Sequence, residues 1–93
     1  MNKILYTKTF ENCIKKFRKE KDLMKILFKR IKDLKYEPKG KFLVGKLSGY
    51  KSIRVAVKYR LIYKYSNENE EITLVVFGHR KMIYELDPNL MCL

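Results

Sequence analysis

Residues 46–65, KLSGYKSIRVAVKYRLIYKY, contain the pattern that decides the fold. From Tyr50 to Val57 apolar and polar side chains alternate, which is the period of a β-strand with one buried face. After a tight turn, Tyr59 to Tyr65 alternates again. Residues 66–70, SNENE, have the composition of a hairpin turn, and a nearly continuous apolar run follows from Glu71 to Phe77. The second half of the chain therefore predicts an antiparallel meander of three strands.

The first half of the chain has the period of helices rather than strands. Lys3 to Tyr6 is a short strand candidate, after which Thr7 or Thr9 can accept a hydrogen bond from an orphan backbone N–H and begin a helix. Asp22 can cap a second helix, and the proline and glycine within residues 38–40 end it. Apolar residues recur at helical spacing in both segments: Phe10, Cys13, Ile14 and Phe17, then Leu23, Ile26, Leu27, Ile31 and Leu34. We expect an antiparallel helical hairpin that packs on one face of the later sheet.

These segments make one α+β domain over residues 1–93, because the chain is long enough for a single modest core. Its parts are a strand at 1–6, a two-helix antiparallel hairpin at 7–37, a meander sheet at 50–78, and a C-terminal turn or helix with a tail at 79–93. A loop covers residues 42–49, and Gly78 interrupts the last strand. The N-terminal strand joins the three-strand meander in a small twisted sheet.

The charge balance indicates an anionic partner. The formal net charge is +12, and between Glu37 and Glu68 there are eight basic residues and no acidic one. Such a surface attracts nucleic acid, an acidic protein or an anionic membrane. No run approaches the ~20 apolar residues of a membrane span, and the opening lacks a signal-peptide core, so we expect a cytoplasmic protein without a membrane partner. Cys13 and Cys92 are too few for a disulfide framework or a zinc site.

Three arginines fall near strand ends of the predicted meander. Arg54 lies on the polar face of the first strand, Arg60 follows the next turn, and Arg80 follows the last strand. Neighbouring ends meet in an antiparallel meander, so these side chains can converge. A guanidinium binds two phosphate oxygens at once and keeps its charge, and the stretch between Glu37 and Glu68 contains no acidic residue to pair with Arg54 or Arg60. The pattern favours phosphate recognition.

His79 and Tyr84 extend this candidate site. His79 is the only histidine and adjoins Arg80 at a strand end, where an imidazole near phosphate can donate or accept a proton at neutral pH. A helical turn would place Tyr84 on the same face as Arg80, where it could stack on an unpaired base or transfer a proton. The alternative is a structural role for each, as is usual for a lone histidine or tyrosine in a core.

The order of these elements resembles the RelE branch of the RelE/ParE toxin superfamily. The resemblance rests on a leucine–x–glycine before the first meander strand, an arginine in that strand, YRLIY at 59–63, and GHRK–x–x–Y at 78–84. The strand and two helices that precede them also agree, so the resemblance covers residues 2–86. It implies a ribosome-dependent endoribonuclease that cleaves mRNA in the ribosomal A site and stops translation, without a metal or other cofactor. It also implies a cognate acidic, RelB-like antitoxin as partner, beside the ribosome and mRNA.

The resemblance assigns roles to residues of this sequence. The catalytic set would be Arg54, Arg60, His79, Arg80 and Tyr84, which promote attack of the ribose 2′-hydroxyl on the adjacent phosphate. Apart from the resemblance, we expect Lys46, Lys51 and Lys58 to contact RNA. Ala56 stands where some members carry a lysine proposed as general base, so His79, Tyr84 or one of these lysines must replace it, or cleavage is weak.

Two other functions remain open at this point. The ParE branch inhibits DNA gyrase on a similar scaffold without nuclease activity, and fold alone cannot separate the two branches. The arginine, histidine and tyrosine set favours cleavage. A basic RNA-binding scaffold with weak or no catalysis is the third interpretation, which the missing base at Ala56 keeps open.

Overall fold

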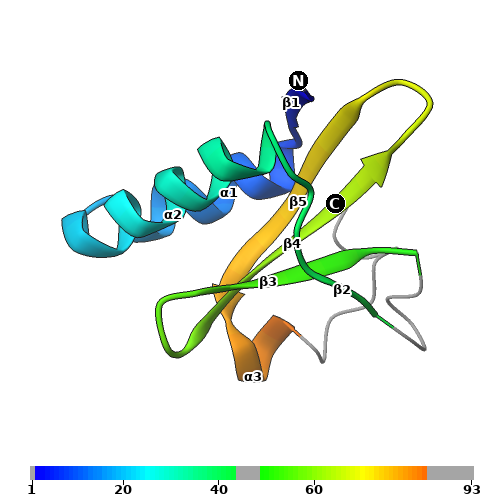
Figure 1. The fold of residues 1–93 in the computed structure, drawn as a ribbon. Coiled ribbons are helices and arrows are strands. Elements are labelled where there is room, and N and C mark those ends of the chain that lie inside the picture. The colour runs from blue at the N-terminus through cyan, green and yellow to red at the C-terminus, as the bar shows by residue number, and fades with distance from the viewer. Residues whose placement is uncertain (1, 44–48, 84–93) are drawn as a thin grey trace.

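The computed structural model describes residues 2–43 and 49–83, which form one sheet with helices on both faces (Figure 1). The predicted site residues Lys46 and Tyr84, and the predicted tail after Tyr84, lie outside the described residues. The strands are β1 (Lys3–Tyr6), β2 (Lys41–Phe42), β3 (Lys51–Val55), β4 (Tyr59–Ser66) and β5 (Glu71–His79), in the spatial order β1-β5-β4-β3-β2. The β3–β4–β5 part is the predicted antiparallel meander, and β1 lies parallel to β5. The predicted α+β class is confirmed.

The two long helices cover one face of this sheet. Helix α1 (Lys8–Phe17) and helix α2 (Lys21–Leu34) run antiparallel, as predicted for the hairpin (Figure 1). On the opposite face, the short helix α3 (Arg80–Ile83) places Ile83 against Ile62 and Val76. None of the helices in the described part of the chain is long and apolar enough to cross a membrane.

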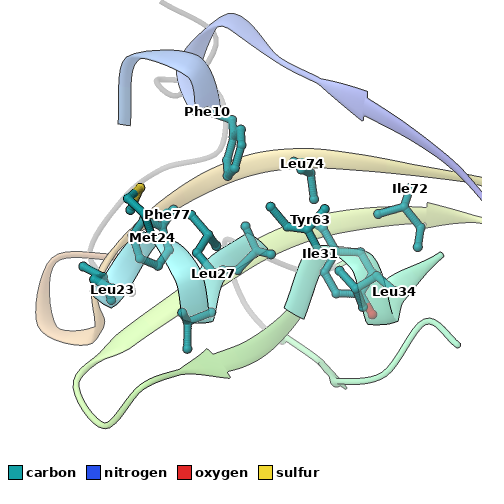
Figure 2. Close-up of a cluster of buried hydrophobic side chains, with 12 residues drawn as sticks. Phe10, Leu23, Met24, Leu27, Ile31, Leu34, Tyr63, Ile72, Leu74 and Phe77 are labelled. Carbon is teal, nitrogen blue, oxygen red and sulfur yellow. The ribbon is translucent and has the colours of Figure 1, made fainter. Parts of the chain in front are cut away.

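The main core lies between the helical hairpin and the sheet (Figure 2). Phe10 of α1, Leu27 of α2, and Leu61 and Tyr63 of β4 are fully buried there. Because β-strand side chains alternate between faces, the neighbours of these residues point to the other face. The arginines of β3 and β4 therefore project away from the helices.

Thr7 joins the start of α1 to the centre of the sheet. Its Oγ1 accepts a hydrogen bond from the Phe10 backbone N–H at 3.1 Å and donates to the Leu74 carbonyl at 2.8 Å. We expect Thr7→Ala to lower the free energy of unfolding by about 1 to 2 kcal/mol, because it removes a helix cap. Urea unfolding measures this loss, with Thr7→Ser as the control that keeps the hydroxyl. An equal loss in both variants would show that the methyl group, not the hydroxyl, matters.

Four details of the predicted elements are wrong. Helix α2 begins at Lys21 with Glu20 at its N-cap, so Asp22 lies in the first turn and does not cap it. The first meander strand ends at Val55, because Ala56 has a left-handed φ of 58° that begins the turn, and Val57 is exposed.

The other two errors concern glycine and a short edge strand. Gly78 does not interrupt β5, since it pairs with Arg60 and the strand continues to His79. Strand β2 takes up Lys41 and Phe42, the latter placed in a loop by the sequence pattern, and pairs them with Ser52 and Lys51.

Candidate functional site

A groove of about 620 Å³ opens beside the part of β3 that extends past its short pairing with β2. It is bounded by the last turns of α2, by the segment that leads from α2 into β2, and by β3 and β4. Five of its lining residues are basic and two are acidic: Arg30, Lys39, Lys41, Arg54 and Arg60 against Asp33 and Glu37. An excess of positive charge in a concave site attracts small or polymeric anions.

Arg54 and Arg60 are the basic residues that β3 and β4 contribute to this groove. They lie directly opposite each other in the β3–β4 register, so their side chains share one face of the sheet. That face is the one away from α1 and α2, because the alternating neighbours Val55 and Leu61 are buried in the main core. The sequence predicted that these two arginines converge, and the structure brings them together.

Neither arginine has a carboxylate partner within the described residues. The ion pair found there joins Lys39 to Glu37, at a nitrogen–oxygen distance of 4.0 Å. Arg60 is half-buried and its Nη1 donates to the carbonyl oxygen of Tyr59 at 3.1 Å, while Arg54 is exposed. Like charges placed directly opposite destabilise a sheet. A bound anion would remove that repulsion.

The wall of the groove is fastened to the sheet by two side chains. The hydroxyl of Tyr63 donates to the carbonyl oxygen of Lys39, and the ammonium of Lys51 donates to the carbonyl oxygen of Pro38 at 2.7 Å. Burial, and secondarily the neighbouring Tyr65, raise the pKa of Tyr63 well above its usual value, so its hydroxyl stays protonated and remains a donor. The segment between α2 and β2 is therefore held in place by its backbone carbonyls.

Lys51 is not brought to the arginine pair. It lies opposite Tyr63 in the β3–β4 register, on the helix side of the sheet. Its ammonium also lies 5.0 Å from the centre of the Phe42 ring and 5.9 Å from that of Tyr65. These contacts support a structural role for Lys51, and its predicted contact with RNA stays a prediction.

His79 also faces the helix side. It pairs with Tyr59 across β4 and β5, and the two rings meet edge to face with centroids 5.9 Å apart. Its Nδ1 accepts a hydrogen bond from the backbone N–H of Lys81 at 3.2 Å, at the start of α3. Its neighbour Gly78, not His79, lies beside Arg60. The predicted catalytic role of His79 stays a prediction.

Arg80 and Lys58 lie at the same end of the sheet as the arginine pair. The backbone N–H of Arg80 donates to the carbonyl oxygen of Lys58 at 2.8 Å, which joins the end of β5 to the β3–β4 turn. Both side chains are exposed. The structure thus gathers Arg54, Arg60, Lys58 and Arg80 at one end of the sheet, although only the first two line the groove.

Sequence reasoning missed three basic residues of the groove, Arg30, Lys39 and Lys41. Arg30 is one of many charged residues on α2, and nothing in a helical pattern selects it. Lys41 belongs to a strand of two residues, which is too short to show an alternation.

Comparison with known proteins agrees with this fold. The sequence model of the ParE toxin of type II toxin–antitoxin systems, parDE, matches residues 4–84. The chain belongs to the ParE toxin family. It is a toxin of the RelE/ParE superfamily, as the sequence resemblance predicted, while the assignment to the RelE branch stays a prediction. No curated protein sequence matches the chain.

Solved structures of other toxins are similar to this ParE-family toxin. A YafQ variant from E. coli is 19% identical, with a TM-score of 0.76 over 90% of this chain and 99% of that one. A metal-bound toxin from Helicobacter pylori is 25% identical, with a TM-score of 0.75 over 89% and 99%. The RelBE2 toxin–antitoxin complex from Mycobacterium tuberculosis contains a chain that is 28% identical, with a TM-score of 0.66 over 85% and 98%.

Proposed function

We propose that this ParE-family toxin is an endoribonuclease that cleaves mRNA in the ribosomal A site and so stops translation. The observation that supports this proposal most is the opposed pair Arg54 and Arg60 in a positively charged groove, without a carboxylate partner among the described residues. Two guanidiniums on one face can bind the oxygens of a single phosphate. They suit a reaction whose transition state adds charge to that phosphate.

The reaction is attack of a ribose 2′-hydroxyl on the adjacent phosphorus. The new oxygen–phosphorus bond gives a cyclic phosphate, and the bond to the 5′-oxygen breaks to release a 5′-hydroxyl. One group must accept the proton of the 2′-hydroxyl and another must protonate the leaving oxygen. The guanidiniums of Arg54 and Arg60 would offset the negative charge of the phosphorane without a metal ion. Arg80 at the same end of the sheet would add to that field.

We propose that the general base is one of the predicted residues. Lys58 lies in the turn between the two arginine-bearing strands, so of the predicted lysines described here it is nearer the pair than Lys51. Lys51 is engaged with the Pro38 carbonyl on the other side of the sheet. Tyr84 and His79 complete the proposed set, with Lys46 as a proposed RNA contact.

We also propose a cognate, acidic, RelB-like antitoxin that neutralises this toxin. The similar structure from Mycobacterium tuberculosis is a toxin–antitoxin complex. The net charge of +12 favours an acidic partner. Such a chain would cover the groove and offset the repulsion between its arginines.

Inhibition of DNA gyrase is the second candidate, because the family model that matches the sequence is the ParE model. The site favours the ribonuclease, since a non-enzymatic inhibitor has no need of two directly opposed arginines without a carboxylate partner among the described residues.

Purified toxin in a translating extract with a defined mRNA tests the proposal. We expect new 5′ ends by primer extension that depend on ribosomes, and none in an extract from which ribosomes have been removed. Intact mRNA together with inhibited supercoiling by purified gyrase would overturn the ribonuclease proposal in favour of the gyrase candidate.

A further inference from the structure

Lys41 occupies a defined position beside the arginine pair. It lies directly opposite Ser52 in the β2–β3 register, and Arg54 is the next residue along β3 on the same face. Lys41 and Arg54 are therefore diagonal neighbours, at about 7 to 8 Å between Cα atoms, which is within reach of long side chains. Lys41, Arg54 and Arg60 all line the same groove.

The backbone that carries Lys41 is fixed on both sides. Before it, the carbonyl oxygens of Pro38 and Lys39 accept hydrogen bonds from Lys51 and Tyr63. After it, the backbone N–H of Leu43 donates to the carbonyl oxygen of Tyr50 at 2.9 Å. The side chain is exposed, but its point of attachment is held against the sheet, so its charge stays at the groove.

We propose that Lys41 is a third phosphate-binding residue of this groove, which contacts the RNA phosphate next to the one held by Arg54 and Arg60. This inference rests on the proposed function and extends it from a single phosphate to two successive ones. A lysine is suited to that second position because its ammonium is a mobile point charge that needs no fixed plane. The arginines orient the reacting phosphate, and Lys41 sets the direction in which the strand leaves it.

The arginine pair favours phosphate over the carboxylates of an acidic protein. A carboxylate offers two oxygens in one plane, which satisfies one guanidinium fork. The guanidinium groups of two arginines on neighbouring strands suit a tetrahedral phosphate, whose oxygens point in several directions. A lysine on an edge strand can also discourage strand pairing between molecules. That role needs only charge at the edge and does not depend on the distance to Arg54.

The test is binding of a short fluorescent RNA in which every ribose carries a 2′-O-methyl group, so that it cannot be cleaved. Fluorescence anisotropy of the full chain gives Kd as a function of KCl concentration. We expect Lys41→Ala to weaken binding about tenfold at low salt, as the loss of one charged hydrogen bond does. The slope of log Kd against log salt should fall by about 0.7, as for one lost contact to a single strand.

Two variants serve as controls. Lys25→Ala removes the same charge from an exposed position on α2 outside the groove, and should change the affinity and the slope less. Lys41→Arg keeps the charge and should restore both. An unchanged unfolding midpoint for Lys41→Ala excludes a structural cause.

The inference is overturned if Lys41→Ala and Lys25→Ala weaken RNA binding equally. It is also overturned if Lys41→Ala weakens only the binding of a fluorescent polyglutamate peptide, since the site would then recognise an acidic protein. Binding does not require ribosomes or cleavage. Failure of the proposed function would therefore be seen separately, as intact mRNA in the translating extract.

Discussion

Replacement of Arg60 by alanine should lower the rate of mRNA cleavage by at least about 100-fold. Arg60 is half-buried and its guanidinium is oriented by the Tyr59 carbonyl, so it is the more fixed member of the arginine pair. A preorganised donor aimed at charge that develops in the transition state typically contributes about 100- to 1,000-fold in rate. Arg60→Lys keeps the charge but loses the planar fork, and we expect an intermediate rate.

The measurement is the rate of appearance of the cut mRNA end in the translating extract with toxin in excess. Arg18→Ala is the matched control, because it removes an exposed arginine between α1 and α2, outside the groove. Cleavage by Arg60→Ala at the rate of Arg18→Ala would show that the site lies elsewhere.

Replacement of Arg54, the other arginine of the pair, adds the free energy of unfolding as a second, independent measurement. Arg54 and Arg60 are directly opposed without a carboxylate partner among the described residues, so each destabilises the free protein through the other. Arg54→Ala should therefore leave the free energy of unfolding unchanged or slightly higher while it lowers cleavage. A fall in stability would instead show that Arg54 is a structural residue. The opposite response of stability and activity is typical of a binding site under electrostatic strain.

The arginine pair could be predicted from the sequence because a hairpin follows simple rules. Alternation in the two strands fixes which face each arginine occupies, and the short turn between them fixes the register. Together these rules place Arg54 opposite Arg60 without any tertiary information. The same local patterns predicted the helical hairpin and the meander.

The remaining part of the site depends on contacts between distant segments. The segment that leads into β2 is held by hydrogen bonds from Lys51 to the Pro38 carbonyl and from Tyr63 to the Lys39 carbonyl, and such bonds leave no periodic signal. The face of His79 could not be predicted either, since it depends on an irregularity in the β4–β5 register, where Ile62 pairs with Val76 but Tyr63 pairs with Leu74, and on β5 continuing through Gly78. A glycine usually suggests the end of a strand, but here it pairs with Arg60. These features depend on contacts between distant segments, which a local sequence pattern does not contain.

Replacement of Gly40 tests this long-range packing most directly. It has a φ of +118°, and a Cβ built there would lie 2.7 Å from both the Ile53 Cγ2 and the carbonyl oxygen of Ser52. Gly40→Ala should lower the free energy of unfolding by about 2 to 6 kcal/mol, because backbone strain and overpacking each cost about 1 to 3 kcal/mol. That is a large fraction of the roughly 5 to 15 kcal/mol that stabilises a small domain.

Gly49 provides the control that separates the two causes. Its φ of +93° is also unfavourable for alanine, but nothing lies within 4 Å of the Cβ that would be added. Gly49→Ala should therefore show only the strain, about 1 to 3 kcal/mol. Urea unfolding of both variants gives the cost of the close approach as the difference. Equal losses would mean that the segment before β2 does not rest on β3 in solution, and Lys41 would then lose the support that holds it beside Arg54.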